Sequence, residues 1–191
     1  MLQPAPIDIY LEVNPNPNSL KFVLNRTLLS DGMSFDFPDT ESAKHAPLAK
    51  MLLEKADVTR VFYMSNFITV TKTENADWHE IQDELKREIR QFIEAGGDIL
   101  TQEIVVPESN EEDSETVKKI KDILDEYIRP AVEGDGGAIT FHSYVDGVVK
   151  VLLQGACSGC PSSTITLKSG IENLMKTMLP NDVTSVEAES L

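Results

Sequence analysis

Two cysteines, Cys157 and Cys160, have the residue type and spacing in this chain that point most directly to metal chemistry. They are the only cysteines among 191 residues, and Ser158 and Gly159 separate them. An iron-sulfur cube needs four sulfur ligands, and a tetrahedral zinc commonly takes four. Because one chain supplies half of such a set, we predict a cluster bridged between two copies, where it can be held and then released.

The loop around the cysteines suits a bulky ligand. Gly155 and Gly159 allow the backbone to bend and to point N-H groups at sulfide or thiolate. A helix is predicted to open at Ser162 and Ser163, after Pro161, and the positive end of its dipole favours thiolate over thiol. The hydroxyls of residues 162–164 fit helix capping better than contact with a cluster.

Three other uses of Cys157 and Cys160 stay open. Thioredoxin-like dithiol exchange also places a C-x-x-C before a helix, but here the pair follows a hairpin and its Ser-Gly spacer lacks proline. A structural zinc bridging two chains would use the same four thiolates, and spacing alone does not exclude it. An inert buried pair is disfavoured by the polar, glycine-flanked loop.

No other part of the sequence forms a local catalytic motif. The three histidines, at positions 45, 79 and 142, are scattered, and no Ser/His/Asp or Cys/His set appears. The glycine-rich run at residues 134–137 lacks the Lys-Ser/Thr of a phosphate-binding loop, so it is interpreted as a connector. We therefore predict that the protein is not an enzyme.

The charge and hydropathy of the chain exclude some classes of binding partner. The chain carries 32 acidic and 17 basic residues, a net charge of −15, which repels nucleic acid and anionic membrane surfaces. No apolar run approaches the roughly 20 residues of a membrane span. The acidity fits solubility and the binding of basic partners equally well. Residues 1–6 match neither a secretory signal nor a transit peptide, which predicts a cytoplasmic protein with reduced cysteines.

An acidic stretch predicts two domains. Residues 103–115 hold six acids and no base, a composition that cannot bury enough apolar surface to order itself. The predicted fold class is α+β, with two small α+β domains at residues 1–102 and 114–191 joined by an acidic linker at 103–113. In the first, the patterns predict strands at 7–13, 20–24, 33–37, 58–64 and 67–73, and helices at 48–55 and 77–94.

The second domain reads as α-β-β-α-β. A helix capped by Ser114 is predicted to end at Pro130, and strands follow at 138–145 and 148–153 around a two-residue turn. The cysteines come next, then a helix that opens after Pro161 and is stopped by Pro180, and a strand at 183–188. This order places the cysteines between the second strand and the second helix.

Two sets of residues resemble one known family. The run LQGACSGCPSSTITLKSGIEN at residues 153–173, with residues 129–130 and 133–137, closely resembles the signature of the Nfu family, also found as the C-terminal domain of NifU. In the first half, residues 14–22, 37–38, 65–72 and 77–78 resemble the Nfu N-terminal domain of the mitochondrial type. The resemblance therefore extends over both halves of the chain.

The resemblance implies an iron-sulfur cluster carrier. Cys157 and Cys160 match the family's cluster ligands, one pair from each subunit of a homodimer around a [4Fe-4S] cluster, with [2Fe-2S] as the other form to consider. The implied partners are an upstream cluster-assembly scaffold and recipient apo iron-sulfur proteins, while the N-terminal domain carries no ligands and assists client choice or transfer. The start of the chain favours a bacterial cytoplasmic copy, with a processed mitochondrial or plastid protein as the alternative.

Overall fold

A computed structural model of the chain describes residues 6–30, 32–102, 114–158 and 161–190. The chain divides into two compact units, Met1–Ile104 and Val105–Leu191. Each unit combines a sheet with helices, which confirms the predicted α+β class. The predicted linker at 103–113 lies outside the described residues, so its bounds stay a prediction.

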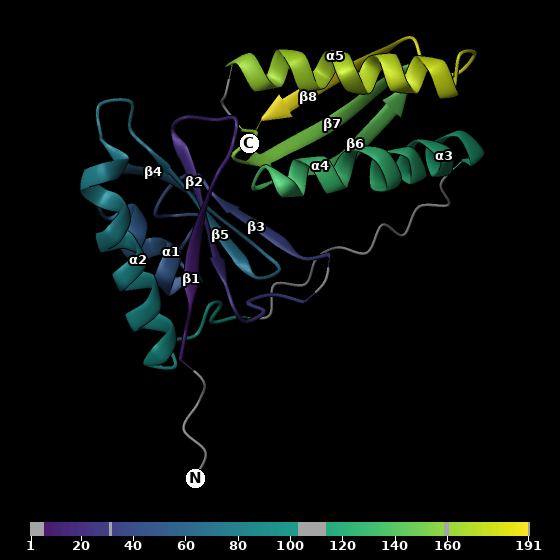
Figure 1. Cartoon of the computed structure of the whole chain (residues 1–191). Coiled ribbons are helices and arrows are strands. Elements are labelled where there is room, and N and C mark those ends of the chain that lie inside the picture. Colours follow the sequence, from purple (N-terminus) through teal and green to yellow (C-terminus); the bar gives the residue numbers. More distant parts are fainter. Residues whose placement is uncertain (1–5, 31, 103–113, 159–160, 191) are drawn as a thin grey trace. The chain divides into compact units, whose positions relative to one another are not determined.

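The first unit is a five-stranded antiparallel sheet with the order β1-β2-β5-β4-β3. Its helices α1 and α2 contribute buried side chains to a single core on one face of this sheet (Figure 1). All seven predicted elements are present: β1 Ile9–Val13, β2 Ser19–Leu24, β3 Ser34–Phe37, α1 Pro47–Leu53, β4 Val58–Met64, β5 Phe67–Lys72 and α2 Trp78–Glu94.

Local side-chain bonds fix the ends of these elements. In the turn between β1 and β2, Asn14 Oδ1 accepts a bond from the Asn16 N-H at 3.0 Å, and Asn16 Oδ1 accepts one from the Asn18 N-H at 3.0 Å. Asparagine favours turns because its side chain bonds the backbone two residues further on. Asp77 caps α2 by accepting from the His79 N-H at 2.9 Å.

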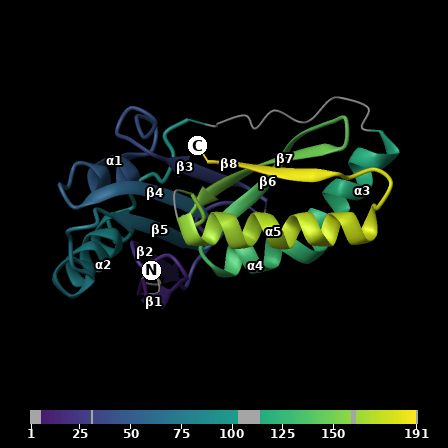
Figure 2. The same ribbon diagram turned by 90° about the horizontal axis from the view of Figure 1, so that it is seen from above.

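The second unit has the predicted order α-β-β-α-β. Its three-stranded sheet runs β6-β7-β8, with β6 and β7 antiparallel and β8 parallel to β7. Alternate residues of β7 are buried, because the helices cover the same face of the sheet (Figure 2). The elements are α3 Glu115–Ile123, η1 Leu124–Ile128, α4 Arg129–Gly134, β6 Gly137–Val145, β7 Val148–Gly155, α5 Pro161–Met178 and β8 Ser185–Ser190.

The first helical segment of this unit differs from the prediction. It was expected to end at Pro130, but the chain passes through the π-helical turn η1 and continues as α4 to Gly134. Pro130 has no N-H to donate and occupies the first turn of α4, where none is needed. A wider π turn just before the proline thus lets the helix continue to the glycine-rich connector.

The described residues contain no helix that is both long enough and apolar enough to cross a membrane.

Candidate functional site

Cys157 lies in the turn between β7 and α5, as the order of elements predicted. Its side chain is buried, with 5% of the residue exposed, and it belongs to the hydrophobic core of the second unit. The second predicted ligand, Cys160, and its neighbour Gly159 lie outside the described residues. The structure therefore places one of the two predicted ligands.

Gly137, the first residue of β6, lies directly against Cys157. A Cβ atom added to Gly137 would be 3.0 Å from Cys157 Sγ, 3.3 Å from Cys157 Cβ and 2.6 Å from the Gln154 carbonyl oxygen. Real Cβ contacts are longer, so no larger residue fits here without movement of the cysteine or the strand. The absent side chain at residue 137 makes the space that Cys157 occupies.

Two further glycines shape the loop that carries Cys157. Gly155 at the end of β7 has φ +64°, and Gly136 before β6 has φ +80°, values that favour glycine over other residues. The Ala156 N-H donates to the Gly136 carbonyl at 3.2 Å, and the Ser158 N-H donates to the Gly155 carbonyl at 3.0 Å. The cysteine loop is thus joined to the connector between α4 and β6.

The run at residues 134–137 is therefore more than a connector. Sequence reasoning found a turn there, and Gly136 does connect α4 to β6. It missed that Gly137 makes room for Cys157, because that contact depends on the pairing of Gly137 with Gly155 across the hairpin. The sequence did offer a signal for this contact: Gly137 follows Gly136 directly, and the turn requires a glycine only at Gly136.

The burial of Cys157 affects one of the alternative uses of the cysteines, the inert buried pair. A thiol packed in a core behaves as a small apolar group. The polar loop was taken as evidence against a buried pair, and the structure shows that at least Cys157 is buried. In this form of the chain, the Cys157 thiol is almost fully withdrawn from solvent.

The histidines considered as candidate ligands are distant from the cysteine loop in sequence. His142 is exposed in β6 beside its irregular pairing with β7, and His79 is exposed in the first turn of α2. Within the described parts of the chain, no three His, Cys, Asp or Glu side chains come together as a metal site. That the histidines are not ligands stays a prediction.

Comparison with known proteins places both units in one family. A family model described as the N-terminal domain of the scaffold protein Nfu/NifU matches residues 9–96, and a model of the NifU-like domain matches residues 120–187. Curated relatives named "NFU1 iron-sulfur cluster scaffold homolog, mitochondrial" from Drosophila grimshawi and Drosophila willistoni are each 44% identical over 181 residues. The matches cover 94% of this chain but only 60% and 62% of those relatives.

Two solved structures also match. A solution structure of a NifU-like protein from Saccharomyces cerevisiae covers 54% of this chain and 92% of its own, with 23% identity and a TM-score of 0.46. A crystal structure of protein SAV1430 from Staphylococcus aureus covers 44% of this chain and 98% of its own, with 20% identity and a TM-score of 0.39.

The names of the relatives contradict the predicted location. A bacterial cytoplasmic protein was expected because residues 1–6 carry no targeting pattern. The relatives at 44% identity are named as mitochondrial proteins, so that expectation is wrong. The alternative given with it, a processed mitochondrial or plastid protein, agrees with these names. The expectation failed because a missing targeting pattern in a few residues says nothing of the compartment in which the folded units work.

The two family models take in a large part of each unit, the cysteine loop among the matched residues, and the chain belongs to the Nfu/NifU family of scaffold proteins.

Proposed function

We propose that two copies of this chain hold a [4Fe-4S] cluster between them and pass it to apo-proteins, acting as a carrier and not as an enzyme. The observation that carries the proposal is the place of Cys157, in a glycine-bounded loop within the unit matched by the NifU-like model. Each chain has two cysteines, so a four-thiolate cluster calls for two chains. The cluster is cargo, and the cysteines are its temporary ligands.

We infer that the loop takes two forms, and that the packed position of Cys157 is the closed one. In the closed form the thiol packs against Gly137 in the core, where it is kept from solvent. Ligation requires the thiol to lose its proton to solvent and turn outward, while the hairpin β6-β7 on one side and α5 on the other stay in place. Burial thus protects the thiol when no cluster is held.

Transfer follows from the small number of ligands in each chain. A recipient that presents thiolates can replace one sulfur ligand at a time, so that the cluster never loses all its ligands at once. Two thiolates from each chain hold the cluster less firmly than four from one rigid site, because the second chain can dissociate. The proposal also places the protein in the mitochondrion, downstream of the machinery that assembles clusters, as the names of the relatives suggest.

Anaerobic reconstitution with iron and sulfide tests the proposal. The expected result is roughly two irons and two sulfides per chain, with the loaded protein at twice the mass of the unloaded chain. Adding an apo iron-sulfur enzyme should then restore its activity while the carrier loses its colour. Loading of a single chain with a whole cluster, or loading without any transfer, would contradict the proposal.

Variants test the ligands. Cys157→Ser and Cys160→Ser should each abolish stable loading and the doubled mass while leaving both units folded. Ser169→Ala is the matched control, because Ser169 is exposed on α5 outside the loop and its replacement removes one oxygen without touching a sulfur. A cysteine variant that loads as fully as the control would show that other residues hold the cluster.

The two alternative uses of the cysteines give different results in the same samples. A zinc-bridged dimer would bind zinc in preference to the cluster and would not activate the recipient. A dithiol oxidoreductase would reduce a disulfide substrate and would form a disulfide between Cys157 and Cys160 during turnover. Either result, with no cluster bound, would replace the carrier proposal.

A further inference from the structure

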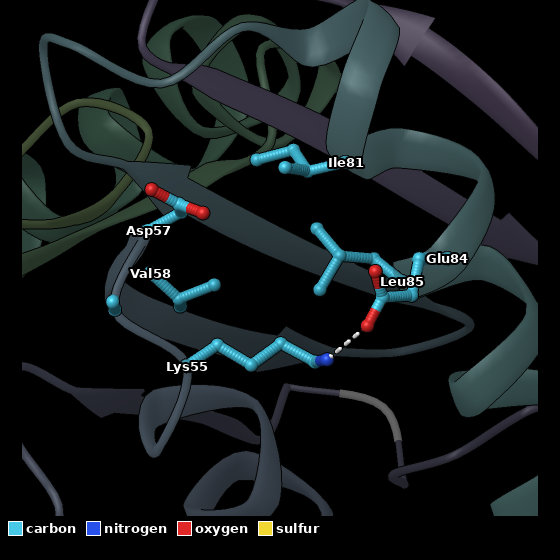
Figure 3. A pocket seen from close by; sticks show the side chains of 7 residues that line it. Lys55, Asp57, Val58, Ile81, Glu84 and Leu85 are labelled. Carbon is cyan, nitrogen blue, oxygen red and sulfur yellow. Dashed lines mark hydrogen bonds and ion pairs between the residues drawn. The ribbon is translucent and has the colours of Figure 1, made fainter.

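The first unit contains a pocket that the cluster chemistry does not use. It lies between the start of β4, with the turn before it, and the first half of α2, and its volume is about 190 Å³. Figure 3 shows Asp57 at one side of the pocket and the Lys55–Glu84 pair at the other, with three apolar side chains, Val58, Ile81 and Leu85, between them.

The floor of this pocket is apolar and belongs to the packed core of the first unit. Val58 and Leu85 are buried members of the core of the first unit, and Ile81 packs against that core. The turn before β4 is held by backbone bonds, since the Val58 N-H donates to the Lys55 carbonyl at 3.1 Å and the Thr73 N-H donates to the Asp57 carbonyl at 2.9 Å. The pocket is thus formed before anything binds.

The rim carries a net negative charge. Lys55 Nζ bonds both Glu84 Oε1 at 2.6 Å and Glu88 Oε1 at 2.8 Å. Partial burial acts to lower the pKa of Lys55, but the two carboxylates outweigh it and keep that pKa above its usual value. Among the residues that line the pocket, Lys55 offsets Glu84, and the exposed Asp57 on the opposite side leaves one net negative charge. Glu88 lies outside the lining, and Arg87 is a nearby cation that acts on Glu84.

We propose that this pocket receives a single arginine side chain from a partner protein, with the guanidinium on Asp57 and the methylene stem on Val58, Ile81 and Leu85. Arginine fits because its stem is apolar and its planar head pairs two N-H groups with one carboxylate. Lysine offers a point charge and no such fork. The charge of the rim favours a basic partner surface, and the net charge of −15 is compatible with one.

This inference concerns partner choice by the first unit and is independent of the proposed cluster. Its test uses the unloaded full chain, so its failure and the failure of the carrier proposal are distinguishable. Isotope-labelled protein is titrated with N-acetyl-arginine amide, and amide shifts are followed by NMR. The expected result is saturable shifts confined to the pocket, with a dissociation constant of roughly 1 mM.

Two related ligands and a set of variants test whether the pocket recognises the guanidinium group. N-acetyl-citrulline amide, a neutral isostere, and N-acetyl-lysine amide should each bind more weakly, and Asp57→Asn should weaken the arginine probe about fivefold. Asp83→Asn is the control, because it removes the same charge from an exposed position of α2 that does not line the pocket. Ile81→Ala should weaken binding through the stem, and Lys55→Met should strengthen it about twofold by unmasking the carboxylates.

Several results would overturn the proposal. Shifts spread over the whole surface without saturation would show that the pocket is not a site. Equal binding of the citrulline or lysine probe would remove the role of the guanidinium. Equal loss in Asp57→Asn and Asp83→Asn would show a general effect of net charge.

Discussion

Replacement of Gly137 by alanine should weaken the second unit and release Cys157 from its packed position. The new Cβ would lie 2.6 Å from the Gln154 carbonyl oxygen and 3.0 Å from Cys157 Sγ. Rotation of the cysteine side chain relieves only the contact with Sγ, and because the Gln154 carbonyl is backbone within the β6-β7 hairpin, the hairpin must shift as well. Overpacking of this kind costs about 1–3 kcal/mol of unfolding free energy.

The chain provides its own reference for this measurement. Its single tryptophan, Trp78, lies in the first unit, so tryptophan fluorescence in urea reports that unit alone. Amide NMR signals of β6 and β7 report the second unit in the same samples. Gly137→Ala should move the second transition to lower urea and leave the Trp78 transition where it is, because the substitution lies in the second unit.

Thiol labelling connects this prediction to the site. Anaerobic labelling with a maleimide should be faster at residue 157 in Gly137→Ala, because the displaced sulfur becomes more exposed. Gly170→Ala, in the middle of α5, is the control of opposite sign: a Cβ there meets nothing within 4 Å, and alanine is better than glycine in a helix by about 1 kcal/mol. If Gly137→Ala matched the unchanged protein in both stability and labelling, the packing described for Cys157 would be wrong.

Three further predictions concern other parts of the two units. Glu172 accepts hydrogen bonds from Lys176 and from a backbone N-H of β8, and these bonds hold the pKa of the Glu172 carboxyl below its usual 4.5. The stability that the ionised carboxylate contributes is therefore present above pH 4.5 and is lost as the pH falls through the lowered pKa of the folded protein. Urea titrations at several pH values should show this loss, and Glu172→Gln should lack it. Asp77→Ala removes the acceptor of the His79 N-H at the start of α2 and should cost the first unit about 1 kcal/mol by Trp78 fluorescence; no change would refute the cap. Gly155→Ala, at φ +64°, should cost the second unit about 1–2 kcal/mol, and an unchanged NMR transition would contradict this.

Sequence patterns predicted the elements well where the residues involved are close together in the chain. The strands of the first unit follow the alternation of apolar residues, and α2 begins at its predicted cap, Asp77. The cysteine loop was placed correctly between β7 and α5 because turn residues and helix signals flank it on both sides. Each of these predictions depends on interactions within a few residues.

Features that depend on distant contacts were not predicted. The fit of Cys157 against Gly137 requires the exact register of β6 on β7, which the hydrophobic pattern does not specify. The pocket of the first unit brings Lys55 to Glu84, 29 residues away, through the packing of α2 beside β4. The π turn before Pro130 was missed because proline was interpreted as the end of a helix.

Native mass spectrometry of the reconstituted protein, kept free of oxygen, counts the chains that share one cluster. Isotope-labelled and unlabelled chains are mixed before loading, so that the mass of each ion gives the number of chains in it. We expect ions that hold two chains and one cluster of about four irons and four sulfides, and some of these ions should contain one labelled and one unlabelled chain. A cluster carried by ions of one chain, or pairs of chains that contain zinc and no sulfide, would contradict it.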